Sequence, residues 1–326
     1  MKAIQMHATG GPEVLQIAEL PIPSAGTGQL LIRVVVAGVN YADIGMRMGM
    51  FHGPQSLPVT PGFEVAGTVV AVGAEVAGFT EGQRVAAVLD AGGYAEYAVA
   101  DAQRAFALPD DITFVDATAL CIQGPTAHGV LYDAGQFTAG DAVLVQAAAG
   151  GVGSLAVQLA KLGGARTVIG TASTTEKRDL ATSLGADTAI DYTQANWVDA
   201  VRAATDGRGV NVLLESVGGA VGAQAYGTLA PLGRIVIFGA ASGRPASLDM
   251  MQMNMLGLRI SGFGGPWLRP GRAEAARTAM IAQIQAGKLR IVHGPSFALA
   301  DAAAAQNVIT SRESTGKVTL HIEAQD

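Results

Sequence analysis

The alternation of apolar strands with helices from residue 142 onward restricts the possible folds more than any other feature of the sequence. Short apolar, β-branched segments lie at 142–148, 166–172, 188–192, 210–216 and 234–240, and helical segments separate them. Strands joined in this way pair in parallel, and the helices cover the faces of the sheet. Residues 123–295 are therefore expected to form an α/β domain built on a doubly wound parallel sheet.

The first 120 residues follow a different pattern, in which Gly and Pro separate short strands. Apolar segments lie at 2–6, 30–39, 65–73 and 84–89, with turn residues between them. This spacing indicates an all-β barrel or sandwich. A last strand-like segment, 316–325, is able to rejoin this domain. The expected domain is therefore discontinuous and consists of residues 1–122 and 296–326.

Composition and charge argue against several classes of partner. Hydrophobic residues make up 49% of the chain, enough for a large core, and the net charge of −6 gives no basis for binding nucleic acid. Residues 142–160 carry no charge, but Gln146, Gln158 and three glycines interrupt them, which argues against a membrane span. The start of the sequence lacks a continuous apolar stretch, so we expect a cytoplasmic protein. The single cysteine, Cys121, excludes an intrachain disulfide.

A glycine-rich turn joins the first strand of the α/β region to its first helix. Gly151, Gly153 and Ala156 fit the spacing G-x-G-x-x-G/A of dinucleotide-binding turns. In that pattern the first glycine permits the tight turn, the second lets the backbone approach a pyrophosphate, and the small third residue allows close packing of helix on strand. Free N–H groups at the helix start then face the anion. This context favours a cofactor site at residues 149–153 (Ala149, Gly150, Gly151, Val152 and Gly153) over an ordinary turn.

The segment after the second strand favours NADP(H) over NAD(H). An NAD site usually has an acidic residue about 20 residues beyond the glycines, bonded to the ribose 2′-hydroxyl. This sequence has Thr171 there, and the hydroxyl of Ser173 and the cations of Lys177 and Arg178 follow. Ser173 and Glu176 also fit a capping box, but that interpretation does not explain cations near a helix N-terminus. A 2′-phosphate would accept charge-assisted hydrogen bonds from them.

The glycine turn "AAAGGVG" resembles the cofactor motif of medium-chain dehydrogenases/reductases, above all the zinc-independent quinone oxidoreductase (zeta-crystallin-like) family. The segments "AGVNYAD", "PGFEVAGTVVAVG", "GGYAEYA" and "GPTAHGVL" resemble that family in the same order, over nearly the whole chain. The resemblance implies a GroES-like β domain (1–122 and 296–326), a Rossmann domain (123–295) and an active site in the cleft between them. It also implies hydride transfer from NADPH to a small apolar quinone or conjugated carbonyl.

The resemblance also bears on metal. In zinc-dependent relatives a Cys and a His are ligands where this chain has Asn40 and Phe63, and neither side chain replaces a thiolate or an imidazole on Zn²⁺. The block of four structural cysteines is missing as well. We therefore expect no metal. Without a Lewis acid, alcohol oxidation is disfavoured, whereas a quinone or an enone already carries an electrophilic carbon.

Several further site residues are expected from the resemblance or from strand ends. Asn40 is similar to the family's asparagine beside the nicotinamide ribose, although an Asn before a turn also bonds backbone. Tyr41 either donates to a substrate oxygen or packs, and Thr126 either lies near the nicotinamide or caps a helix. Relatives bind the adenosine phosphate near the position of Tyr192. Ligands of parallel sheets collect at strand ends, which adds Ser216, Val217, Phe238, Gly239, Ala240, Phe263 and Gly264.

Other expectations concern side chains near these sites and the assembly. Asp43 is expected to be structural, His128 to be packed, and Lys317 to be exposed. The family's cleft tyrosine is replaced by Gly45, and enoyl thioester reductases have a tyrosine where this chain has Phe51. The alternatives to a quinone or enone reductase are a catalytically silent, crystallin-like binding or sensor protein and an enoyl thioester reductase. The strand "LRISGF" at a sheet edge is expected to pair with its copy in a homodimer, unless a loop covers it.

Overall fold

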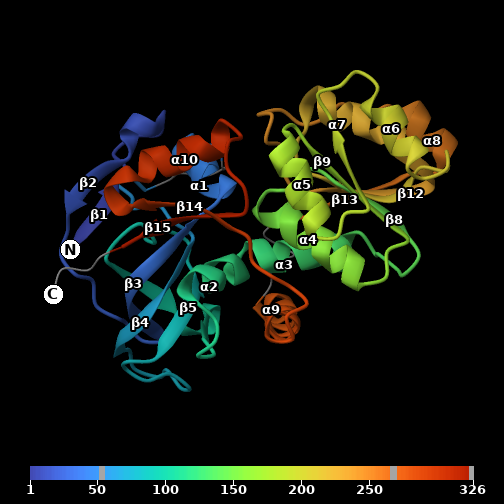
Figure 1. Cartoon of the computed structure of the whole chain (residues 1–326). Helices are drawn as coiled ribbons and strands as arrows, with labels where there is room; N and C mark the ends of the chain where they lie inside the picture. Colours follow the sequence, from blue (N-terminus) through green and yellow to red (C-terminus); the bar gives the residue numbers. More distant parts are fainter. Residues whose placement is uncertain (51–55, 265–269, 323–326) are drawn as a thin grey trace. The chain divides into compact units, whose positions relative to one another are not determined.

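The computed structural model describes residues 1–50, 56–264 and 270–322 (Figure 1). The chain divides into two compact units, one comprising Met1–Ile122 with Val292–Asp326 and the other Gln123–Ile291. The sequence-based boundary at 296 falls inside strand β14 (His293–Ala298), and the structure divides the chain just before that strand instead.

The first unit is built on a mostly antiparallel sheet of short strands. Its strands run in the order β14-β15-β3-β4-β5-β7, and β6 also pairs with β3. The long central strand β3 explains this arrangement, because it pairs antiparallel with β15, β4 and β6. The bounds are β3 Gln29–Val39, β4 Glu64–Val72, β5 Arg84–Val88, β6 Tyr97–Asp101, β7 Ala105–Ala107 and β15 Lys317–His321; a separate hairpin joins β1 (Lys2–Gln5) to β2 (Gln16–Glu19).

Apolar side chains of these strands form the core of the first unit. Leu30, Ile32 and Val34 in β3 are at most 1% exposed, and alternate residues of β15, Val318 and Leu320, join the same cluster. The strand β15 thus belongs to the first unit because it pairs with β3 and its apolar side chains join the core of that unit. Three helices accompany this sheet: α1 (Tyr41–Arg47), α2 (Phe114–Cys121) and α10 (Ala302–Thr310).

The second unit contains a six-stranded, fully parallel sheet in the order β10-β9-β8-β11-β12-β13. The chain starts in the middle with β8, winds outward to β10, and then returns to β11 on the other side of β8. Ligands of such sheets bind beyond the carboxyl ends of the strands where the winding reverses. The bounds are β8 Ala142–Val145, β9 Thr167–Ala172, β10 Thr188–Asp191, β11 Val210–Glu215, β12 Leu229–Ile237 and β13 Arg259–Gly262.

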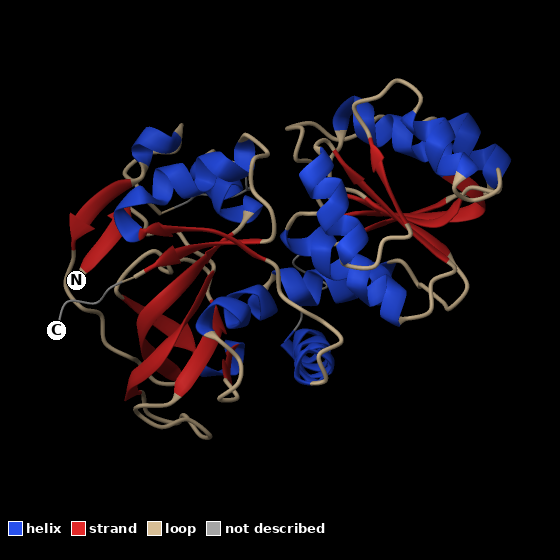
Figure 2. Ribbon diagram, viewed as in Figure 1, coloured by secondary structure: helices blue, strands red, loops and turns tan. Residues whose placement is uncertain are grey.

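Helices cover both faces of this parallel sheet (Figures 1 and 2). Helices α4 (Gly151–Leu162) and α5 (Thr175–Ser183) lie on one face, and α6 (Trp197–Ala203), α7 (Gly219–Ala225) and α8 (Met250–Leu256) lie on the other. Trp197 and Val201 of α6 pack with Leu144 and Leu213 of the sheet in one core cluster. The unit also contains α3 (Gln123–His128), a π-helical turn (Gly129–Ala134) and α9 (Pro270–Gln285).

The helical segment between the strands expected at 210–216 and 234–240 is shorter than the interval between them. It ends at Ala225, and β12 begins at Leu229, because Leu229 is 1% exposed in the sheet and Leu232 takes a positive φ of 61° that a helix does not allow. The uncharged run 142–160 folds as a strand, a turn and a helix. Within the described parts of the chain, no helix has both the length and the apolar character that crossing a membrane requires.

Candidate functional site

The glycine turn lies between β8 and α4, as the sequence predicted, but its tight bend falls on a different residue. Ala147 takes the left-handed conformation, with φ of 48°, whereas Gly151 is already the first residue of α4. Gly150 is the N-cap in extended conformation and donates its N–H to the Ala147 carbonyl at 2.8 Å. The expectation that Gly151 makes the turn is therefore wrong, since a non-glycine residue bears that strain.

Neighbouring atoms of the protein limit the room for a side chain at two glycines of this turn. A Cβ on Gly151 would collide with the side-chain amide of Gln123, and a Cβ on Gly153 would collide with the carbonyl of Ala147. Gly150, in contrast, has only the Ala147 oxygen within 4 Å of a Cβ, at 3.2 Å. The third small residue, Ala156, is completely buried, as the spacing predicts for close packing of helix on strand.

The first turn of α4 is suited to an anion. N–H groups at the start of an α-helix have no acceptor inside the helix, and the helix dipole adds positive potential there. Gly150, Gly151 and Val152 are all partly exposed at this end, while Gly153 is buried. The N–H groups of Gly151 and Val152 can therefore approach a phosphate, whereas the Gly150 N–H is already bonded to Ala147 O.

The hydroxyl-rich and basic segment follows β9 directly. Thr171, near the end of β9, is 1% exposed, and Ser173 and Lys177 are half-buried. The expected Ser173–Glu176 capping box is wrong by one residue, because the N-cap of α5 is Thr174, whose side chain accepts from the Lys177 N–H at 3.4 Å. Thr171 and Ser173 thus precede the helix, and Lys177 lies in its first turn.

Arg178 is held by neighbouring side chains. Its Nη1 lies 3.2 Å from the Asp191 carboxylate at the end of β10, and its Nη2 donates to the Thr175 hydroxyl at 3.0 Å. Both partners of the ion pair are about one-fifth exposed. The guanidinium is therefore fixed beside the end of β10, where Tyr192 follows immediately as a half-buried residue packed on the core.

The remaining strand-end residues lie along the same edge of the sheet, because they follow the carboxyl ends of parallel strands. Main-chain hydrogen bonds tie their loops together: Phe238 N–H donates to Glu215 O at 3.0 Å, Ala241 N–H to Ser216 O at 3.0 Å, and Phe263 N–H to Ile237 O at 2.8 Å. The structure brings together the predicted residues Ser216, Val217, Phe238, Gly239, Ala240, Phe263 and Gly264.

Two polar residues at this edge were missed by the sequence reasoning. Gln146, 1% exposed, follows β8, and its Oε1 accepts from the N–H groups of Ser216 at 3.3 Å and Val217 at 3.4 Å. Glu215 ends β11, and its Oε1 accepts from Val217 and Gly218; burial raises the pKa of this carboxyl. Both residues could have been found in the sequence, because each is a polar residue at the end of an otherwise apolar strand: Gln146 in "VLVQ" and Glu215 in "VLLE".

Thr126 and His128 lie in α3, next to the glycine turn. Thr126 is the fourth residue of that helix, so the alternative of a helix N-cap is wrong, and its side chain is half-buried. The His128 ring packs 4.7 Å from the Tyr132 ring, and burial lowers the pKa of His128. The ring of buried Phe263 occupies the space that a Cβ on Gly129 would need.

The predicted site residues of the first unit centre on Asn40. Its backbone N–H donates to the Asp43 carboxylate at 2.7 Å, at the start of α1. Its side-chain Nδ2 donates to Glu64 Oε1 at 2.8 Å, and its Oδ1 accepts from Lys317 Nζ at 3.2 Å. Lys317 also forms an ion pair with Glu64. Lys317 is 1% exposed, so the expectation of an exposed lysine is wrong.

Asp43 and Tyr94 extend this polar cluster. Both side chains are completely buried. Burial raises the pKa of Asp43 to about 7, against the opposing effect of the Asn40 N–H, and nearby Glu64 raises it further. Burial also raises the pKa of Tyr94 well above its ordinary value, and the Asp43 charge adds to this shift. An ionised and a protonated form of Asp43 are therefore both accessible near neutral pH.

Tyr41 is the first residue of α1 and is half-buried. In the methionine-rich segment that follows, Met46 is buried, whereas Met48 and Met50 are about half exposed. Phe51, which bears on the enoyl thioester alternative, lies outside the described residues.

Among the residues that the structure describes, no group of three or more His, Cys, Asp or Glu side chains could hold a metal ion. Cys121 is buried, with Sγ 3.5 Å from Ala117 O and 3.7 Å from Ala87 O. Glu64, the carboxylate next to the position of a zinc ligand in zinc-dependent relatives, is bonded to the Lys317 ammonium. A buried cation beside Glu64 makes this position unfavourable for a second cation.

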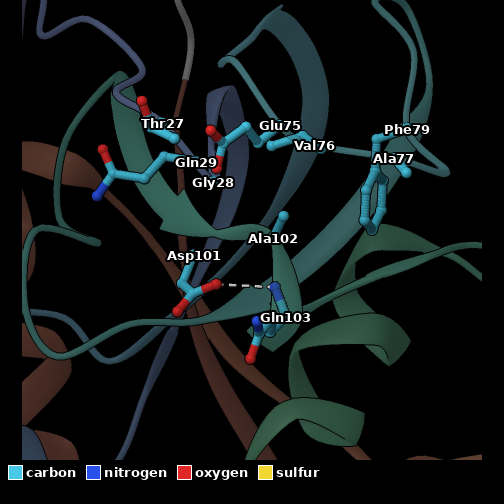
Figure 3. A pocket seen from close by; sticks show the side chains of 10 residues that line it. All are labelled: Thr27, Gly28, Gln29, Glu75, Val76, Ala77, Phe79, Asp101, Ala102 and Gln103. Atoms are coloured by element: carbon cyan, nitrogen blue, oxygen red, sulfur yellow. Dashed lines mark hydrogen bonds between the residues drawn. The ribbon is translucent and has the colours of Figure 1, made fainter.

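A cavity of about 510 Å³ opens elsewhere in the first unit, at the amino end of β3 (Figure 3). Glu75 and Asp101 are the charged residues in its lining, and the Asp101 carboxylate accepts from the Gln103 N–H at 2.8 Å. Because Asn40 follows the other end of this eleven-residue strand, the cavity lies roughly 35 Å from Asn40 along β3. None of the predicted site residues lines it, so it is not part of the candidate site.

The chain matches two described families and several characterised proteins. Residues 26–110 match "Alcohol dehydrogenase GroES-like domain", and residues 151–278 match "Zinc-binding dehydrogenase". A quinone oxidoreductase of Pseudomonas aeruginosa is 36% identical, with 98% of this chain and 99% of the relative aligned. The quinone oxidoreductase of Sus scrofa is 33% identical, over 98% and 97%. The structure of Escherichia coli quinone oxidoreductase complexed with NADPH has a TM-score of 0.92 at 29% identity, over 98% and 100%. The predicted fold class, a GroES-like domain with a Rossmann domain, is confirmed.

Proposed function

Because this chain belongs to the quinone oxidoreductase family of the medium-chain dehydrogenases/reductases, we propose that it reduces quinones or α,β-unsaturated carbonyls with NADPH and without a metal. That it is an oxidoreductase follows from its full-length similarity to such enzymes. The observation that carries the choice of cofactor is the open start of α4 next to the segment with Thr171, Lys177 and Arg178.

The residues of the second unit fit NADP(H). The main-chain N–H groups of Gly151 and Val152 would hold the pyrophosphate, with Ala149, Gly150 and Gly153 shaping the turn. Thr171, Ser173, Lys177 and Arg178 offer hydroxyl and cationic donors for a 2′-phosphate. The edge residues Tyr192, Ser216, Val217, Phe238, Gly239, Ala240, Phe263 and Gly264, together with Thr126, would line the rest of the cofactor. When bound, NADPH supplies hydride.

The chain's own residues then have to orient the substrate and stabilise charge. Asn40, with its amide held between Glu64 and Lys317, is the proposed catalytic residue of the first unit. Tyr41, one residue later, offers a phenol hydroxyl to a substrate oxygen that becomes negative during hydride transfer. The half-exposed Met48 and Met50 supply an adaptable apolar surface for a small conjugated substrate.

The absence of metal chemistry is proposed from the residue types. Asn40 and Phe63 stand where zinc-dependent relatives have ligands, and the Lys317 ammonium neutralises Glu64. A quinone or enone needs no Lewis acid, because its own carbonyl makes a carbon electrophilic.

A homodimer is proposed as well. The edge strand β13 pairs with β12, which leaves its other side available for a copy. Met250, Met251 and Met255 of α8, in the segment just before β13, are each at least 66% exposed. A cytoplasmic location stays a prediction from the sequence.

Purified protein mixed with NADPH and a panel of quinones, enones, enals and an enoyl thioester tests the proposal. We expect loss of NADPH absorbance with quinones or enones, and little loss with NADH. Lys161→Ala is a control variant that should turn over like the wild type. It removes an exposed lysine of the same unit that lies far along α4 from the first turn of this helix. Binding of NADPH without turnover on any substrate would contradict the enzyme and favour the catalytically silent alternative.

A further inference from the structure

The side-chain amide of Asn40 is held at both ends by buried charged groups. Glu64 accepts from Nδ2 at 2.8 Å, and Lys317 donates to Oδ1 at 3.2 Å, while the two charges contact each other. Exposure is 6% for Asn40, 0% for Glu64 and 1% for Lys317, so water does not compete for these bonds. Rotating the amide by 180° would place NH₂ against ammonium and oxygen against carboxylate. Only one orientation of the amide is therefore compatible with its neighbours.

The three residues come from three neighbouring strand ends. Asn40 follows β3, Glu64 opens β4 and Lys317 opens β15, and both strands pair antiparallel with β3. Gly38 of β3 makes room for the triad, because a Cβ there would collide with the Glu64 carboxylate and the Lys317 side chain. The backbone of Asn40 is fixed independently through its N–H bond to Asp43. Both the position and the orientation of the amide are thus determined by the sheet.

A buried ion pair of this kind is not required for stability. Taking two charges out of water costs about as much as their attraction returns, and apolar residues of similar volume often replace such pairs without loss. The charges have a different consequence for Asn40. Because Glu64 accepts from Nδ2 and Lys317 donates to Oδ1, the amide cannot turn over, and its donor and acceptor sides keep fixed directions.

On these grounds, and resting on the proposed function, we propose that Glu64 and Lys317 are positioning residues that fix the amide of Asn40 for contact with the bound ligand. They touch neither substrate nor cofactor in this role. Their effect on turnover is transmitted through Asn40 alone. Without them the amide rotates, and the fraction of molecules in the productive orientation falls.

The test uses two double variants of the full-length chain. Glu64→Leu with Lys317→Met removes both charges and the two hydrogen bonds that Glu64 and Lys317 make with the amide. Glu64→Gln with Lys317→Met is the matched control, since it also removes both charges but keeps a carbonyl that accepts from Asn40 Nδ2. We expect the first variant to lower kcat by about tenfold to a hundredfold with a much smaller change in KM for NADPH, and the control to lose clearly less.

The same changes made in an Asn40→Ala background separate positioning from a general structural role. We expect no further loss of kcat there, because the residue on which the pair acts is absent. An equal loss in both backgrounds would overturn the proposal. If the Leu/Met variant does not fold, the Gln/Met variant in the two backgrounds decides the same question.

An NMR measurement keeps this proposal distinct from the proposed function. The two Nδ2 hydrogens of Asn40, assigned by their disappearance in Asn40→Ala, are expected to give separate, exchange-protected signals in the wild type and averaged, exposed ones in the Leu/Met variant. Unchanged signals in that variant would overturn the positioning role. A wild type without turnover on any substrate would overturn the proposed function only, and the NMR result would still decide the positioning of Asn40.

Discussion

The candidate site residues of the two units rely on different kinds of chemical group. Around the glycine turn of the second unit, the groups that would meet a ligand are main-chain N–H groups, and small residues keep side chains away from them. Around Asn40 in the first unit, the groups are side chains, and buried charges from distant parts of the sequence hold them. The first kind of site depends on space, whereas the second depends on electrostatic pairing. Substitutions should therefore impair the two units in different ways, by steric collision around the glycine turn and by loss of charge pairing around Asn40.

The largest effect is expected where a buried charge loses its partner. Lys317→Met removes the countercharge of the buried Glu64 carboxylate and leaves it the hydrogen bond from Asn40 Nδ2, and breaking such a buried pair costs about 3–5 kcal/mol. Lys161→Met, which removes the exposed partner of Asp187, should cost less than about 1 kcal/mol. Urea unfolding of both variants measures the difference. Equal losses would show that the Lys317–Glu64 pair behaves like a surface pair.

The next effect concerns space at the glycine turn. Gly153→Ala places a Cβ against the Ala147 carbonyl and should displace the turn, with a loss of about 1–3 kcal/mol in the free energy of unfolding and weaker NADPH binding. Gly150→Ala is the matched control, since its nearest neighbour is 3.2 Å away and its φ of −78° suits alanine. Calorimetric denaturation and NADPH titration compare the two. A stable Gly153→Ala variant with unchanged affinity would remove the steric argument.

The glycine turn shows how much of the structure could be predicted from the sequence. The glycine spacing is local, so the strand, turn and helix around residues 146–157 were predictable, as were the strand ends that share one edge of the sheet. The exact bend at Ala147 was not, because glycine is the usual residue at positive φ and the sequence offered three of them nearby. The N-cap shifted from Ser173 to Thr174 for a similar reason, since adjacent hydroxyl residues cap equally well.

The Asn40 cluster was beyond sequence reasoning. Lys317 lies 277 residues from Asn40, and a lysine is normally exposed. Only the register between β15 and β3 brings the two together. The sequence around Glu64 and Asp43 does not indicate that these residues are buried, because their neighbours are equally typical of a strand end and of a turn. Long-range pairing of polar groups depends on the fold, whereas a backbone site depends on a short segment.

A smaller effect is expected at the basic segment after β9. Lys177→Ala with Arg178→Ala removes two partly exposed cations near the proposed 2′-phosphate, and each exposed charged pair contributes about 0.2–1 kcal/mol. Affinity for NADPH should therefore fall by about twofold to thirtyfold, while affinity for NADH stays nearly unchanged. Because Arg178 also pairs with Asp191, Asp191→Asn is the control for loss of that ion pair alone. Isothermal titration with both cofactors measures the ratio, and an equal loss for NADH would contradict a phosphate-specific role.

The smallest effect concerns Asp43, where burial raises the pKa to about 7. The unfolded carboxyl titrates near 3.9, so between about pH 4 and 7 the folded state holds a proton that the unfolded state has lost. Stability therefore falls as pH rises through this window and levels off above it. Between pH 6 and 8 the loss from Asp43 should be on the order of 1 kcal/mol. Glu64, Lys317 and Tyr94 surround this carboxyl and stay in place in Asp43→Asn, so that variant should lose the slope and keep the rest of the pH profile. Parallel urea-unfolding profiles for wild type and Asp43→Asn would mean that Asp43 is ionised throughout, and that the buried cluster around Asn40 carries one more negative charge than its geometry implies.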